Sequence, residues 1–118
     1  GDTFAYDEKA YDDKEEREIK AARRIFNILP SDQAEEIWEL WREFEKQETP
    51  EALYAASLDR LQPLLLNYFT EGHTWKMPGV TSKKVYDRMA PIKKSTPELW
   101  EFVVGIIEDS IRKGYLRR

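Results

Sequence analysis

The fold is decided by residues 49–69, TPEALYAASLDRLQPLLLNYF. The threonine, proline and glutamate at the start favour the first turn of a helix, because the hydroxyl caps a backbone N–H and proline needs no partner there. Apolar residues then cover most of the circumference of the helix that follows. A helix that is apolar nearly all round is a central one, so we expect residues 50–69 to lie in the middle of a helical protein.

Helical periodicity continues on both sides of this segment. Apolar residues recur at helical spacing in four more segments, bounded by capping residues, prolines or a glycine. The first begins at Asp12 or Asp13 and ends before Pro30, and the second runs from a cap at Ser31 or Asp32 through Phe44. The third begins after Thr81 or Ser82 and is limited or kinked by Pro91. The fourth runs from Thr96-Pro97-Glu98 to Gly114. No segment indicates a β-strand. The sequence therefore predicts an all-α fold of about five helices, in one domain over residues 1–118 with an irregular lead-in over residues 1–11.

Composition excludes several classes of protein. The 118 residues are 41% hydrophobic and 36% charged, and no apolar run approaches the roughly 18 residues that a membrane-spanning helix needs. The sequence has no cysteine, which excludes disulfides, thiolate catalysis and cysteine-ligated zinc and fits a cytoplasmic protein. It has no P-loop, no GxSxG and no HExxH motif. A self-sufficient enzyme site is therefore not visible in this chain.

The charge is unevenly distributed. Residues 31–51 hold eight acidic and two basic side chains, whereas residues 76–118 hold ten basic and five acidic ones, within a formal net charge of −4. The basic residues are scattered over helical positions, and no nucleic-acid-binding motif accompanies them. We therefore expect solvated surfaces that bind neither nucleic acid nor membrane.

Asp59 is the residue of the central helix that most suggests chemistry. A carboxylate on a buried helix must be paired, hydrogen-bonded or bound to a metal, and the neighbouring Ala55 and Ala56 leave room beside it. Pro63 has no N–H for the Asp59 carbonyl to accept, so the helix is expected to kink there. Two interpretations remain open: Asp59 belongs to a binding site, or it forms an interhelical ion pair with an arginine such as Arg23, Arg24 or Arg88.

The same stretch, extended to residues 48–72, strongly resembles the C-terminal part of HD-domain hydrolases of the 5′-deoxynucleotidase-like group. Leu-Pro-Ser-Asp-Gln at residues 29–33, residues 40–50, Leu-Trp-Glu-Phe at residues 99–102 and Lys-Gly-Tyr-Leu at residues 113–116 look like the same family. The resemblance implies a helical HD-domain fold that binds one divalent metal through a His…His-Asp…Asp set. The last Asp of that set falls on Asp59, and a family Gly-Asp falls on Gly1-Asp2. By resemblance, Asp59 is thus a metal ligand and Asp2 a catalytic residue that handles the substrate or the attacking water.

The resemblance also implies a function. It suggests a metal-dependent phosphohydrolase that converts (deoxy)nucleoside monophosphates to nucleoside and phosphate, using Mn, Co, Mg, Fe, Ni or Zn, and that forms a homodimer. The family histidines and the Asp beside the second one are not in this sequence, and His73, the single histidine, matches neither position. We therefore expect a piece of a longer HD domain that is inactive by itself. The alternative is a non-enzymatic helical interaction module that offers the Trp38 and Trp41 stripe, or the basic C-terminal helix, to a partner.

Overall fold

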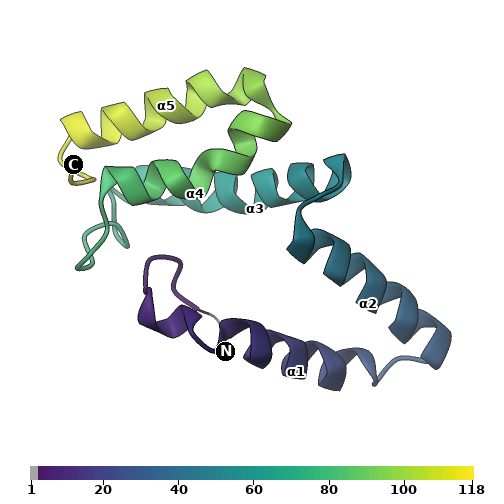
Figure 1. Ribbon diagram of the computed structural model, residues 1–118. Coiled ribbons are helices and arrows are strands. Elements are labelled where there is room, and N and C mark those ends of the chain that lie inside the picture. Colours follow the sequence, from purple (N-terminus) through teal and green to yellow (C-terminus); the bar gives the residue numbers. More distant parts are fainter. Residues whose placement is uncertain (1–2) are drawn as a thin grey trace. The chain divides into compact units, whose positions relative to one another are not determined.

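The computed structural model describes residues 3–118, and all regular structure in that range is helical (Figure 1). A short 3₁₀ helix, η1 (Lys9–Tyr11), precedes five α-helices, which are α1 (Lys14–Phe26), α2 (Ser31–Lys46), α3 (Pro50–Phe69), α4 (Ser82–Ser95) and α5 (Pro97–Arg112). The expected all-α class with five helices is confirmed. The chain divides into two compact units, one ending at Lys46 and one covering Gln47–Arg118.

The first unit is built around an aromatic cluster between α1 and α2. The Phe26 ring lies 6.3 Å from those of both Trp38 and Trp41, and the two tryptophan rings lie 5.3 Å apart. Both tryptophans are only half-buried, and Ala22 is the one fully buried apolar residue described in this unit. Two helices cannot enclose side chains of this size without a further layer.

The end of α1 comes earlier than expected. The helix stops at Phe26 rather than at Leu29, and the next residues form a tight turn with bonds from Ile28 N–H to the Ile25 carbonyl and from Leu29 N–H to the Phe26 carbonyl. Bonds of this i→i+3 type supply donors to the last carbonyls of a helix, which lack partners within the helix. Because the turn begins ahead of Pro30, the apolar side chain of Ile28 points outward and is 80% exposed.

The second unit holds the main core. Helix α3 packs on α4 and α5, and α4 packs on α5. Trp75 and Val80 from the loop at residues 70–81 are almost completely buried, so this loop is part of the core rather than a mobile connection. The other buried apolar residues of the unit are Ala52, Ala56, Leu64, Val85, Met89, Ile92, Val103, Ile107 and Leu116.

Helix starts follow the sequence closely, with one difference at Thr96. Thr49 caps α3 by accepting a bond from Ala52 N–H at 3.2 Å, and Thr81 caps α4 in the same way. Thr96 precedes α5, but its hydroxyl donates to the Ile92 carbonyl at the end of α4 instead. Pro91 lies inside α4 and does not end it. Only Thr96 separates α4 from α5, and its side chain adds a second bond to the Ile92 carbonyl, which already accepts Thr96 N–H at 2.9 Å.

The C-terminal residues close the second unit. The backbone carbonyl of Arg117 accepts a 2.7 Å bond from Ser82 N–H, and its guanidinium donates to the Met77 carbonyl at 2.8 Å. These bonds attach the end of the chain to the loop at residues 70–81 and to the start of α4. Among the helices of residues 3–118, none is both long and apolar enough to cross a membrane.

Candidate functional site

Asp59 lies on the exposed side of α3, so the expectation that it is buried is wrong. Helices α4 and α5 cover only one side of α3, where Ala56, Ser57 and Leu64 are buried. The other side, which we call the Asp59 face, is open to solvent. Its residues are Tyr54, Ala55, Leu58, Asp59, Gln62, Pro63, Leu66 and Phe69.

The Asp59 face is mainly apolar. Leu58 is 47% exposed, Leu66 56% and Phe69 75%. These exposures explain the error in the sequence analysis, because an apolar residue is not always a buried one. The pattern correctly identified a helix with apolar residues all round, but the second unit by itself covers only half of it.

The carboxylate of Asp59 has no partner in the part of the chain that the structure describes. No hydrogen bond or ion pair joins it to another residue. Of the two interpretations left open by the sequence, the interhelical ion pair with an arginine is thus not formed among residues 3–118, and the Arg88 carbonyl accepts a bond from Arg60. Both oxygens of Asp59 are therefore available to a ligand from outside this unit.

Pro63 lies one turn after Asp59, and α3 continues through it to Phe69. Proline supplies no N–H to the Asp59 carbonyl. The Pro63 carbonyl accepts a 3.1 Å bond from the side-chain amide of Asn67. The carbonyl to which Pro63 cannot donate and the open carboxylate therefore both belong to Asp59.

Residues 3–118 do not complete a metal site. No group of three or more histidine, cysteine, aspartate or glutamate side chains in this range could hold a metal ion. His73 is exposed in the loop after α3. A single carboxylate does not supply the three or four ligands of a divalent metal centre, so no catalytic step follows from these residues alone. The other expected site residue, Asp2, lies outside the described residues.

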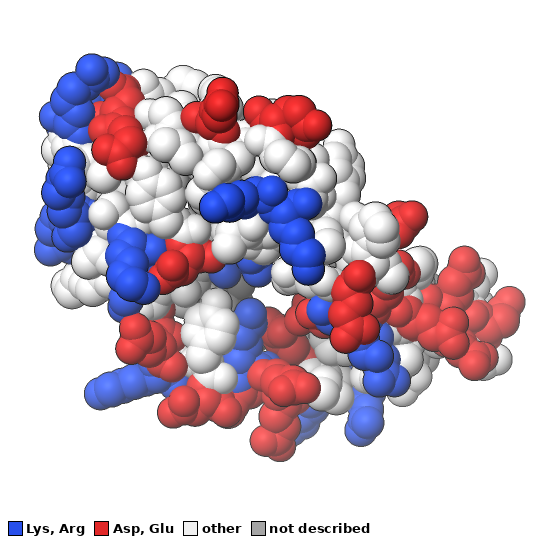
Figure 2. Space-filling view, turned by 45° about the horizontal axis from the view of Figure 1, so that its top comes forward, with Lys and Arg blue, Asp and Glu red and all other residues white. Residues whose placement is uncertain are grey.

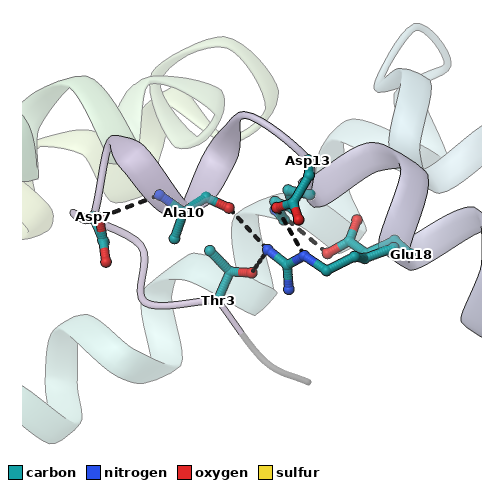
Figure 3. Close-up of polar contacts among 7 residues, drawn as sticks. Thr3, Asp7, Ala10, Asp13 and Glu18 are labelled. Atoms are coloured by element: carbon teal, nitrogen blue, oxygen red, sulfur yellow. Dashed lines mark hydrogen bonds and ion pairs between the residues drawn. The ribbon is translucent and has the colours of Figure 1, made fainter.

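Arg17, which the sequence analysis did not single out, holds the segment before α1 together. Its guanidinium donates to two groups of the lead-in, the Thr3 hydroxyl and the Ala10 carbonyl, and to the carboxylate of Asp13 (Figure 3). The only sequence signal was the spacing of Asp13 and Arg17 by four residues, which favours an ion pair on a helix. The contacts with Thr3 and Ala10 depend on the path of the lead-in and could not be read from that spacing.

A hollow of about 750 Å³ lies beside α1 and α2 in the first unit. Its apolar lining includes Trp38, Trp41 and Ile19, and the Arg23 guanidinium lies 5.8 Å from the Trp38 ring. Both acidic and basic side chains border it, so its charge does not select a ligand. Acidic side chains also gather on α2 at the right of the view in Figure 2, which disfavours nucleic acid on that helix.

The strongest pKa shifts lie between helices, away from Asp59. Burial and a 2.7 Å bond to Glu108 raise the pKa of Tyr86 to about 12. Hydrogen bonds from Lys113 and Tyr68 hold the pKa of Asp109 well below its ordinary value. These groups join α3 and α4 to α5, so the shifts reflect structural pairs rather than a catalytic centre.

Comparison with known proteins adds information that the geometry does not contain. Residues 1–100 match the family model described as "HD domain". The chain is 35% identical over 65 residues to the 5′-deoxynucleotidase HDDC2 of Mus musculus, and 29% identical over 109 residues to that of Xenopus laevis. These alignments cover 55% and 92% of this chain.

A solved structure is similar over the whole chain. It is the crystal structure of a predicted metal-dependent phosphohydrolase from Magnetospirillum magnetotacticum MS-1, which matches 100% of this chain with a TM-score of 0.93 and 48% sequence identity. The chain corresponds to 59% of that structure, and its alignments span 33% of the mouse protein and 53% of the frog protein. All these relatives therefore contain substantial sequence beyond the matched part.

Proposed function

The chain belongs to the HD domain family, and on that premise we propose that the complete protein is a metal-dependent phosphohydrolase. The observation that carries the proposal is Asp59, an exposed carboxylate without a partner among residues 3–118. By resemblance, it falls on the last metal-ligating aspartate of the family. The similarity to a solved structure described as a predicted metal-dependent phosphohydrolase supports it.

The proposed substrate is a phosphomonoester, specifically a (deoxy)nucleoside 5′-monophosphate, which is cleaved to nucleoside and phosphate. The names of the relatives from mouse and frog support this substrate class, because both are 5′-deoxynucleotidases.

In this proposal Asp59 supplies one ligand to a divalent ion, and the other ligands come from elsewhere in the complete protein. The bound ion would polarise a phosphate oxygen and lower the pKa of a bound water. The choice among Mn, Co, Mg, Fe, Ni and Zn is left to experiment. Asp2 is proposed as the residue that handles the substrate or the attacking water, as an acid or a base.

The Asp59 face also supports association of the protein with another protein surface. Contiguous exposed apolar residues mark surfaces that bind other protein surfaces, and Leu58, Leu66 and Phe69 are all about half exposed or more. We propose that the complete protein covers this face and is a cytoplasmic homodimer. Light scattering measures its mass, and a monomeric mass would contradict the dimer.

The test measures phosphate release from deoxynucleoside 5′-monophosphates by the complete protein, with each divalent metal and with EDTA. Asp59→Asn should abolish metal-dependent release, because an amide is a poor replacement for an anionic ligand. Asp87→Asn is the matched control, since Asp87 is also exposed on a helix of the second unit and forms only a surface pair with Lys83. Equal loss in both variants, or activity that EDTA does not reduce, would contradict the proposal.

The same assay distinguishes the proposed phosphohydrolase from the alternative, a non-enzymatic interaction module. An interaction module would release no phosphate in its complete form and would be indifferent to metal and chelator. The exposed apolar side chains of the first and second units are compatible with it. Metal-dependent hydrolysis that requires Asp59 would rule out a purely non-enzymatic role.

A further inference from the structure

Gln62 is the polar residue closest to Asp59 on the Asp59 face. It follows Asp59 by three residues in α3, and residues at this spacing lie on one side of a helix with Cβ atoms about 5–6 Å apart. Both side chains are exposed. Tyr54 is the other polar residue of the face, but it lies five residues before Asp59 and therefore projects in a different direction around the helix. A ligand held at Asp59 is thus within reach of Gln62.

The side-chain amide of Gln62 has no partner among residues 3–118. No hydrogen bond joins it to another described residue, although a glutamine and an aspartate three apart on a helix can bond to each other. Asn67 carries another side-chain amide of the same helix and is buried, with its N–H on the Pro63 carbonyl and its oxygen on Thr74. The amide of Asn67 is therefore used by the fold, whereas the amide of Gln62 is open to a ligand.

The surroundings of the Gln62 amide are apolar. Leu58 and Leu66, four residues before and after it, are both about half exposed, and Pro63 is the next residue in the chain. The proposed function has this face covered in the complete protein. A polar amide that is covered without a hydrogen bond destabilises the covered state, so a group that binds over this face has to bond to Gln62.

An amide with apolar neighbours suits the nucleoside part of a nucleotide better than its phosphate. The Gln62 side chain presents N–H donors and a carbonyl acceptor together. A sugar hydroxyl or the edge of a base also offers a donor and an acceptor, beside an apolar ring. A phosphomonoester at neutral pH offers mainly charged acceptor oxygens, for which arginine and lysine are the usual partners. The residues that form the Asp59 face include neither of these two.

We propose that Gln62 is a binding residue for the nucleoside part of the substrate. This inference rests on the proposed function, in which a (deoxy)nucleoside 5′-monophosphate is cleaved at the Asp59 face. The nucleoside does not change during cleavage of the phosphate ester, so a bond to it is equally strong before and in the transition state. Loss of such a bond raises KM and leaves kcat unchanged. A purely structural role of Gln62 would instead affect all phosphomonoesters alike.

The experiment gives the complete protein three phosphomonoesters, which are a deoxynucleoside 5′-monophosphate, 2-deoxyribose 5-phosphate and p-nitrophenyl phosphate. Gln62→Met keeps the length and helix propensity of the side chain but removes its hydrogen bonds. We expect KM for the deoxynucleotide to rise by about 3- to 10-fold at an unchanged kcat, and no change with p-nitrophenyl phosphate. A similar rise with deoxyribose phosphate assigns the bond to the sugar, and no rise assigns it to the base. Gln33→Met, at an exposed glutamine of α2, should match the wild type throughout.

Calorimetric titration with the two products gives a readout that does not depend on turnover. Gln62→Met should bind the deoxynucleoside about 3- to 10-fold more weakly than the wild type and inorganic phosphate equally well. An equal change with all three substrates, or the same deoxynucleoside affinity in both proteins, would overturn the role of Gln62 while leaving the phosphohydrolase function intact. Absence of phosphate release by the wild type from all three substrates, with every metal, would instead overturn the proposed function, and this inference with it.

Discussion

The Tyr68 hydroxyl on α3 donates a 2.7 Å hydrogen bond to Asp109 Oδ2 on α5. Lys113 Nζ lies 2.8 Å from the same oxygen and donates to the Tyr68 hydroxyl at 2.9 Å. Arg112 contacts the other oxygen of Asp109. This network joins residues 41 positions apart in the sequence and connects the C-terminal halves of the helix that carries Asp59 and the last helix.

The pH dependence of stability should reflect this network. Lys113 and Tyr68 lower the pKa of Asp109 in the folded state, so the folded protein binds fewer protons than the unfolded chain in mild acid. The stabilisation is therefore present above the ordinary carboxyl pKa of about 3.9 and is lost as pH falls through the lower folded pKa. We expect urea unfolding of Asp109→Asn to depend less steeply on pH below about pH 5 than that of the wild type. Asp87→Asn should keep the wild-type slope, and an unchanged slope in Asp109→Asn would contradict the prediction.

Substitution of Gly72 should be the most damaging glycine change. Gly72 has φ of +76°, and an added Cβ would lie 2.1 Å from the backbone carbonyl oxygen of Tyr115. We expect Gly72→Ala to lower the free energy of unfolding by about 2–4 kcal/mol, because strain and backbone displacement add.

Two other glycines provide the comparison for that measurement. Gly79 has φ of +83° with nothing near its Cβ position, so Gly79→Ala should cost only about 1–2 kcal/mol. Gly105 lies in α5 with open space beside it, and Gly105→Ala should stabilise by about 0.5–1 kcal/mol. A different order of the three in denaturant unfolding would show that the C-terminal residues do not pack on the loop as described.

Asn67 should be essential to the loop after α3. Its amide donates to the Pro63 carbonyl, and its oxygen accepts bonds from both N–H and hydroxyl of Thr74, at 3.1 and 2.7 Å. Asn67→Ala removes the acceptor of Thr74 N–H and of the Thr74 hydroxyl, and we expect a loss of about 1–3 kcal/mol in unfolding free energy. Thr70→Ala, which removes an exposed hydroxyl, should change it by less than about 0.5 kcal/mol. Comparable losses in the two variants would contradict the role of Asn67.

Divalent metal should not stabilise residues 1–118 alone. The described residues offer Asp59 without a cluster of further ligands, and a ligand raises Tm only when it binds the folded state. We expect the same Tm with EDTA and with Mn²⁺ or Co²⁺, and no release of phosphate from nucleotides. The complete protein should lose Tm on EDTA treatment, and Asp59→Asn should lose this response. A saturable rise in the Tm of residues 1–118 that Asp59→Asn removes would show that this chain completes a site by itself.

Local signals in the sequence were sufficient to predict the helices. Thr49 caps α3 as expected, and Thr81, one of the two candidate caps, caps α4, because a cap involves only groups within one turn. The apolar periodicity of α5 was also read correctly, since Val103 and Ile107 are completely buried. Family resemblance, confirmed by the match of residues 1–100, assigned Asp59 its proposed role.

The tertiary structure decided which of these residues are exposed to solvent and which contact one another. Periodicity identified the apolar residues of α3, but only the packing of α4 and α5 on one side determined that Asp59, Leu58 and Leu66 are exposed. Thr96 repeats the motif of Thr49 and yet bonds to the helix before it. The sequence by itself thus determined the helices and the family, because these depend on neighbouring residues and on matching motifs. Only the fold brought Tyr68 to Asp109 and Arg17 to Thr3, because such contacts depend on the path of the chain between them.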